Sequence, residues 1–159
     1  MTRLLLVVAL GAIVSACTPD NDVDYCRDHY LYHADHLEGL GRLSISLSED
    51  GVLSSDLLLP ETSISDAAVD ALQNVGSVYR LQTSRACTSA TSDVRRQGSA
   101  ILASYESQCG TDNKIGQLDV VLFDNLASLE ELEVVVKTPV TQKRFAISRQ
   151  CDSAIFRLD

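Results

Sequence analysis

The apolar run at the N-terminus constrains this chain more than any other feature, because it decides where the rest of the chain folds. A single basic residue, Arg3, precedes the apolar segment 4–14, and two small residues follow it. That order is typical of a secretory signal peptide, and the run is too short to cross a bilayer core of about 30 Å as a permanent helix. A retained membrane helix or a buried core helix is the alternative. We therefore expect residues 1–16 to be removed and the remainder to fold after export.

The end of this segment, Val14-Ser15-Ala16-Cys17, resembles the lipobox of bacterial lipoproteins: an aliphatic residue, two small residues and a cysteine. The resemblance covers residues 1–17 and implies that Cys17 becomes the N-terminus, with a diacylglycerol thioether and an N-acyl chain such as palmitate. Several buried acyl chains hold a protein where one would dissociate, because each buried methylene contributes about 0.8 kcal/mol. Thr18 stands where an aspartate would retain such a protein in the inner membrane. The resemblance therefore implies a lipid anchor in the cell outer membrane, with the domain facing the periplasm.

The remainder has the composition of one globular domain. The chain of 159 residues is 45% hydrophobic with a formal net charge of −9, which is too apolar for a disordered chain. We expect residues 17–22 to be a lipidated tether and residues 23–159 a single domain. The acidic balance opposes binding to nucleic acid, whose phosphates it would repel.

Four further cysteines, Cys26, Cys87, Cys109 and Cys151, favour two disulfides. An even number of cysteines in an exported domain is typical of disulfide pairing in the oxidising periplasm. The alternative, free thiols or a zinc site, is opposed by the spacing, because no two of them form a C-x2-C pair. Four cysteines allow three pairings, and composition does not choose among them.

Periodicity predicts that helices and strands alternate in the first half of the chain. Apolar residues at three- and four-residue steps predict a helix over 22–38, and alternation with serines predicts a hairpin over 43–59 that turns at Asp50-Gly51. Ser63 with Asp66 resembles a capping box and predicts a short helix that ends at Gly76, followed by a strand over 77–87.

The stretch 92–110 fits two structures. Val94, Gly98, Ile101 and Tyr105 fit a helix, which we favour, and a strand from residue 99 to 107 fits nearly as well. The remainder is mostly β, with strands at "QLDVVLF", "ELEVVVK", "KRFAISR" and "AIFRL". The predicted fold class is α+β: an antiparallel sheet of short strands packed by two or three helices, with two disulfides.

Two similar segments indicate an internal repeat, with chance similarity as the alternative. "YRLQTSRAC" (79–87) and "KRFAISRQC" (143–151) share Arg, Ser, Arg and Cys, and "DLLLP" and "DVVLF" precede them. If each half forms its own bridge, Cys26 pairs with Cys87, and Cys109 with Cys151. The favoured helix also opposes a bridge from Cys87 to Cys109, because about 16 helical residues rise about 24 Å and bridged Cα atoms lie about 6 Å apart.

All three histidines lie in the predicted helix over 22–38. His29, His33 and His36 share one arc of the helix, so their imidazoles could bind zinc or copper. A flank of histidines and tyrosines with apolar bodies and polar tips is the other interpretation, and it is the commoner one for an amphipathic helix. We favour the flank and predict no metal site and no cofactor.

No motif predicts an enzyme. The chain has no G-x-S-x-G, no glycine-rich phosphate loop and no H-E-x-x-H. The basic residues near the C-terminus are interpreted as balancing the acidic N-terminal part, with a patch that binds an acidic partner as the alternative. They are Lys137, Lys143, Arg144, Arg149 and Arg157.

The sequence thus predicts a non-enzymatic binding or accessory lipoprotein of the cell envelope, with an envelope protein as partner. Two alternatives remain open. The first is a ligand-binding lipoprotein for a metal ion at His29, His33 and His36 or for a small apolar molecule, and the second is an inhibitor or immunity-type lipoprotein.

Overall fold

The computed structural model describes residues 41–61, 64–149 and 155–157. Over these residues the chain is mostly β, with nine strands, two short α-helices and one 3-10 helix. In chain order they are β1 (Gly41–Leu47), β2 (Val52–Pro60), α2 (Asp66–Ala71), η3 (Val75–Ser77), β3 (Tyr79–Thr83), β4 (Thr91–Gln97), β5 (Ala100–Gln108), β6 (Ile115–Val120), α3 (Leu122–Asn125), β7 (Glu131–Lys137), β8 (Gln142–Ser148) and β9 (Ile155–Arg157).

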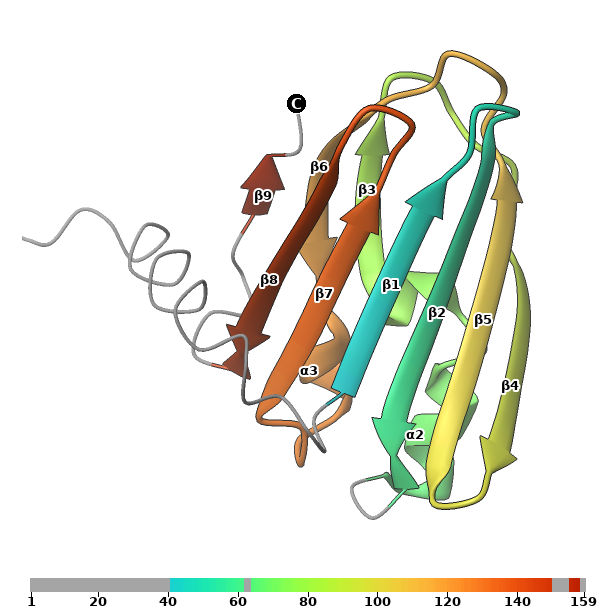
Figure 1. Cartoon of the computed structure of the whole chain (residues 1–159). Coiled ribbons are helices and arrows are strands. Elements are labelled where there is room, and N and C mark those ends of the chain that lie inside the picture. The colour runs from blue at the N-terminus through green and yellow to red at the C-terminus, as the bar shows by residue number, and fades with distance from the viewer. Residues whose placement is uncertain (1–40, 62–63, 150–154, 158–159) are drawn as a thin grey trace, which may run out of the picture.

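Two sheets form the two layers of the fold. The larger sheet has six strands in the order β4-β5-β2-β1-β7-β8, and the smaller has three in the order β3-β6-β9. All pairs are antiparallel except β1 with β7, which run parallel. Figure 1 shows the smaller sheet, α2 and α3 behind one face of the larger sheet. We call that face the inner face and the opposite one the outer face.

Alternation along the strands places the core between the layers. Leu43, Ile45 and Leu47 of β1 are buried, whereas Arg42 is exposed, because successive side chains of a strand point to opposite sides. The predicted hairpin over 43–59 is confirmed by β1 and β2, which pair antiparallel. Its turn is at the predicted Asp50-Gly51, where Gly51 has a φ of 78°.

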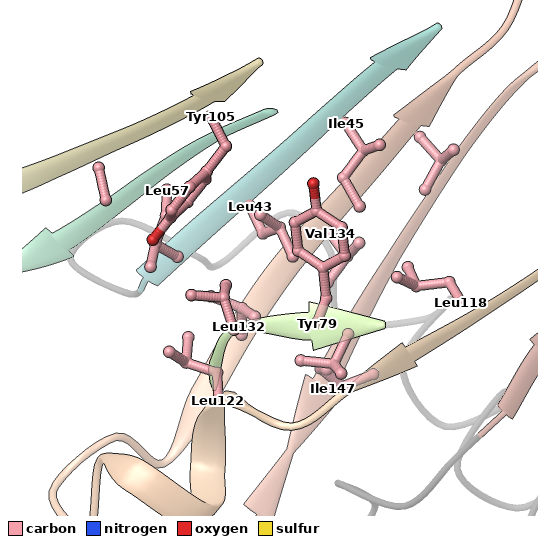
Figure 2. Packing of buried hydrophobic residues seen from close by; sticks show 14 of the residues in the cluster. Leu43, Ile45, Leu57, Tyr79, Tyr105, Leu118, Leu122, Leu132, Val134 and Ile147 are labelled. Carbon is pink, nitrogen blue, oxygen red and sulfur yellow. The ribbon is translucent and has the colours of Figure 1, made fainter. Parts of the chain in front are cut away.

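Two tyrosines connect the layers through the core. The hydroxyl of Tyr79, on β3, lies 2.7 Å from the hydroxyl of Ser55 on β2. Tyr105, on β5, donates a hydrogen bond to the carbonyl of Leu72, which follows α2, at 2.6 Å. Figure 2 shows both rings among leucine, isoleucine and valine side chains of the two layers. The polar ends of the rings are thus satisfied, as burial of a hydroxyl requires.

The predicted α+β class is wrong, and the stretch 92–110 accounts for much of the difference. This stretch forms strands β4 and β5, an antiparallel hairpin that turns at Gly98, where φ is 63°. Strand β5 pairs along its whole length with β2. As in a strand with one face in the core, buried Ile101, Ala103 and Tyr105 alternate with more exposed residues. Pairing with a distant strand overrides the local helical pattern.

The helix predicted after Pro60 is shorter than expected. It is α2 (Asp66–Ala71), and its N-cap is Ser65, whose hydroxyl accepts from the backbone N–H of Ala68 at 3.3 Å. The chain then continues as η3. Ser63 of the predicted capping box lies outside the described residues. The predicted helix over 22–38 lies outside the described residues.

The internal repeat is also wrong. "YRLQTSRAC" begins as β3 in the smaller sheet, whereas "KRFAISRQC" begins as β8 at the edge of the larger sheet. The preceding "DLLLP" lies in β2 of the larger sheet, and "DVVLF" runs from β6 of the smaller sheet into α3. The two segments have different partners and are not equivalent. The two segments are similar because each begins as a short strand in which apolar and polar residues alternate.

Candidate functional site

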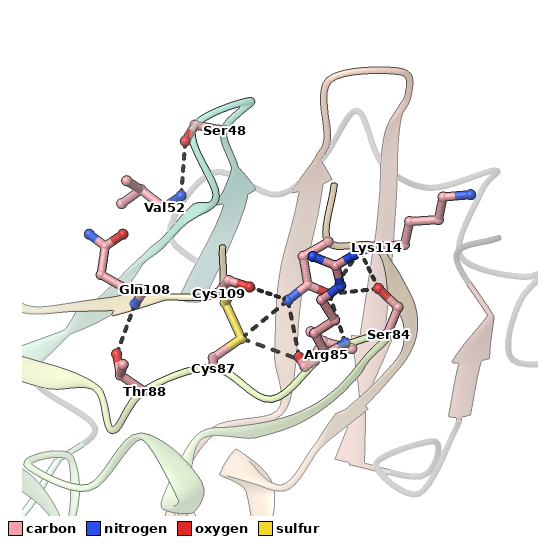
Figure 3. Close-up of a disulfide and its surroundings, with 11 residues drawn as sticks. Ser48, Val52, Ser84, Arg85, Cys87, Thr88, Gln108, Cys109 and Lys114 are labelled. Atoms are coloured by element: carbon pink, nitrogen blue, oxygen red, sulfur yellow. Dashed lines mark hydrogen bonds between the residues drawn. A yellow bond between two sulfur atoms is a disulfide. The ribbon is translucent and has the colours of Figure 1, made fainter. Parts of the chain in front are cut away.

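A disulfide joins Cys87 to Cys109, with Cα atoms 4.0 Å apart. The predicted pairings, Cys26 with Cys87 and Cys109 with Cys151, are therefore wrong. The expectation that Cys87 and Cys109 lie too far apart depended on a helix between them. The hairpin of β4 and β5 instead runs out to Gly98 and returns, and it brings the two cysteines together at one end of the sheets (Figure 3).

The side chain of Asn113 holds together the two loops that this disulfide joins. Its amide nitrogen donates to the carbonyls of Arg85 at 3.0 Å and Cys109 at 2.9 Å. Its oxygen accepts from the Ser84 hydroxyl at 2.8 Å and from the backbone N–H groups of Arg85 and Lys114 at 3.1 and 2.9 Å. Asn113 is only 9% exposed, so both ends of its amide are satisfied inside the protein. The disulfide and the bonds of Asn113 thus cross-link the loops at this end of the fold.

The outer face of the larger sheet carries a buried carboxylate between two arginines. Glu133, on β7, is 2% exposed although its strand position faces outward. One carboxylate oxygen accepts from Nε of Arg42, its direct neighbour on β1, and the other accepts from Nε of Arg144 on β8. The arginine side chains remain about half exposed. The three residues tie β1, β7 and β8 together and present two guanidinium groups to solvent.

The same face carries two apolar side chains beside these charges. Leu58 on β2 and Leu102 on β5 are direct cross-strand neighbours, and Leu58 is 45% exposed. Arg42 lies opposite Leu58 on one side, and Arg95 of β4 lies opposite Leu102 on the other. Two leucines between two arginines form a small amphipathic row. We call these four residues the outer row.

Arg149 is partly buried, and its guanidinium group binds other groups of the fold. Its guanidinium donates to the carbonyls of Phe123, Leu126 and Leu129, and it lies over the Phe123 ring with Cζ 5.8 Å from the centroid. It thereby donates to carbonyls in and after α3, where a helix end leaves carbonyls without partners inside the helix. Arg144 and Arg149 thus have partners within residues 123–133, outside the acidic N-terminal part, and the predicted balance between the two parts stays a prediction.

Burial shifts the titration of the two core tyrosines. Burial raises the pKa of Tyr79, and the hydrogen bond with Ser55 offsets part of the increase. Burial, with a smaller repulsion from Tyr79, raises the pKa of Tyr105 far above its ordinary value. Both phenols remain protonated at neutral pH and act as structural hydrogen-bond donors and acceptors.

The predicted histidine site and lipid attachment site lie outside the described residues. These are His29, His33 and His36, and Cys17 within Val14-Ser15-Ala16-Cys17; Cys26 and Cys151 lie outside as well. In the part of the chain that the structure describes, no three histidine, cysteine or acidic side chains lie close enough together to hold a metal ion. None of the helices described has the length and apolar character needed to cross a bilayer.

The roles of Asn113 and Glu133 were not predicted from the sequence. "GTDNKIG" has the composition of an ordinary turn, although an asparagine in a turn is also a signal for side chain to backbone bonding. In "ELEVVVK" the alternation of acidic and apolar residues places Glu133 on the outward side of a strand.

No protein-family model matches this chain, and no curated protein sequence matches it.

Proposed function

We propose that this chain is an exported, lipid-anchored accessory protein of the cell envelope, without catalytic activity of its own. The observation that carries the proposal is the Cys87–Cys109 disulfide, because disulfides persist in oxidising compartments and are rare in the cytosol. It supports the expectation from the N-terminal signal and the lipobox, which lead the chain to the periplasm. The anchor would be at Cys17, in the outer membrane.

The described body has the properties of a binding scaffold. Its loops are fixed by a disulfide and by Asn113, and its core tyrosines are bonded across the layers. The outer row offers exposed Leu58 between arginines, an arrangement suited to an apolar contact with acidic residues around it. We therefore propose an envelope protein as the partner and the outer row as its contact.

Two measurements test this proposal. Intact mass of the protein purified from membranes should show loss of residues 1–16 and added acyl chains, and a Cys17→Ala variant should lack both and leave the outer-membrane fraction. An unprocessed N-terminus without acyl groups would refute the anchor.

The partner is tested by co-purification from membranes in mild detergent. A double variant, Leu58→Glu with Leu102→Glu, should lose a stoichiometric protein that the wild type retains. Val140→Glu is the matched control, because Val140 is 93% exposed but lies in the turn between β7 and β8, away from the outer row. Retention of the same partner by the double variant would remove the outer row from the proposal. A bound metal or lipid in place of a protein would favour the ligand-binding alternative.

A further inference from the structure

Strand β4 ends the larger sheet with an open edge. In the described part of the chain it pairs with β5 alone, over Thr91–Gln97, without a register shift or a proline. Half of the backbone N–H and C=O groups of an edge strand point away from the sheet, so a regular edge is a template for another strand. Proteins commonly protect such edges with charged side chains.

The charges of β4 are arranged so that one alignment of two copies makes them complementary. Asp93 and Arg95 both point to the outer face, two positions apart, and their side chains are 67% and 59% exposed. Two antiparallel copies of β4 can be aligned about Val94, about Asp93 or about Arg95. Alignment about Asp93 or Arg95 places like charges opposite each other. Alignment about Val94 places each Asp93 opposite an Arg95 of the other copy.

The opposite edge of the larger sheet lacks this property. Strand β8 carries Lys143 and Arg144 and no acidic residue, so no alignment of two β8 strands makes an opposite-charge pair. Arg144 also takes part in the pair with Glu133. The self-complementary pattern therefore belongs to β4.

We propose that two copies of this chain associate antiparallel through β4, aligned about Val94, with Asp93 of each copy opposite Arg95 of the other. The two larger sheets become one continuous sheet across the contact, because β4 is the edge strand of each (Figure 1). Within one copy Asp93 and Arg95 already lie 3.7 Å apart, and in the dimer each gains a cross-strand partner. Exposed charge pairs contribute little each, so they select the alignment, whereas backbone hydrogen bonds supply the association.

The contact involves seven residues from each copy, which is well below the 20 to 30 residues per side of a standard stable interface, at roughly 800 Å² per partner. We therefore expect a weak, reversible dimer that is seen at high protein concentration. Confinement to a membrane surface would raise the local concentration of a lipid-anchored chain.

Charge exchange between the two positions tests the proposal. The full chain is purified in detergent, and its association is measured by analytical ultracentrifugation. At positions 93 and 95, Asp93→Arg gives only arginines and Arg95→Asp gives only aspartates, so each variant alone should dimerise at least about tenfold more weakly. An equimolar mixture of the two variants should associate as the wild type does, because every position then faces an opposite charge. The double exchange, Asp93→Arg with Arg95→Asp, should also dimerise.

Arg80→Asp is the matched control, since it reverses an exposed arginine of the smaller sheet, 72% exposed, and should leave association unchanged. Circular dichroism spectra of all variants should match the wild type, since both positions are exposed. A wild type that stays monomeric at every concentration would overturn the proposal. So would single variants that dimerise as well as the wild type, or a mixture that fails to recover association.

Discussion

At the scale of single residues, Asn113 does more than its place in an ordinary-looking turn indicates. Replacement by alanine removes both donors and the acceptor that hold Arg85, Cys109 and Lys114 in place. Because it removes the partner of the buried Cys109 carbonyl and of the partly buried N–H and carbonyl of Arg85, we expect Asn113→Ala to lower the free energy of unfolding by about 2–4 kcal/mol. Urea unfolding monitored by circular dichroism measures this loss.

Asn125→Ala is the matched control, because the exposed Asn125 makes a single hydrogen bond from its amide, to the carbonyl of Ser77. Its loss should be below about 1 kcal/mol. Equal losses for the two variants would contradict the role assigned to Asn113.

The two buried tyrosines predict a loss of stability in alkali. The pKa of each phenol is raised in the folded protein from the ordinary value of 10.0. Below pH 10 both states keep the protons. Above it the unfolded chain ionises first, so the free energy of unfolding falls as the pH rises. We expect Tyr79→Phe with Tyr105→Phe to flatten this decline between pH 9 and pH 11 relative to the wild type, measured by urea midpoints. An unchanged slope would contradict the assignment.

At the scale of elements, Gly51 shows how the turn of the predicted hairpin is tied to a distant loop. Its φ is 78°, and a Cβ built there would lie 2.1 Å from the backbone of Gly110. Both effects destabilise Gly51→Ala, by about 3 kcal/mol in total. Gly98→Ala has a similar φ of 63° but open space around the added carbon, so it should cost only about 1–2 kcal/mol. Thermal or urea unfolding separates the two, and similar losses would contradict the close approach.

These elements also show which parts of the fold the sequence could predict. The hairpin of β1 and β2 was predictable, because its alternation and its Asp50-Gly51 turn lie within one short stretch. The hairpin of β4 and β5 was not, because its helical spacing is overridden by pairing of β5 with β2. The parallel pairing of β1 with β7 joins strands far apart in the chain and leaves no local signal.

The candidate site follows the same rule. The sequence shows the positions of the cysteines but not their pairing. The pairing depends on the hairpin between Cys87 and Cys109, which brings these two residues together. The ion pairs of Glu133 likewise depend on β1 and β8 lying on either side of β7. The members of a site made of cross-strand neighbours can be predicted only when the strand order is known.

At the scale of the whole molecule, the observed disulfide limits the remaining cysteine chemistry. Once Cys87 and Cys109 are joined and Cys17 carries the lipid, Cys26 and Cys151 remain. Gly41 and Ile147 pair with Leu132 from opposite sides of β7, so they lie about 10 Å apart at two strand spacings. Strand β1 therefore begins, and β8 ends, at the same end of the larger sheet, and by elimination among the cysteines we predict a second disulfide between Cys26 and Cys151.

Peptide mapping without reduction tests this bridge, because trypsin cleaves between all four cysteines of the domain, after Arg27, Arg95 and Lys114 among other sites. A bridge that joins the two ends of the domain closes a loop of more than 100 residues. In the chain-entropy view its loss should cost about 4 kcal/mol, and Cys26→Ser and Cys151→Ser should lose equal amounts of stability, since either change breaks the same bond. Free thiols at both positions, or a bridge that appears only between two copies on a non-reducing gel, would show that the body is held by the observed disulfide and its core without this second link.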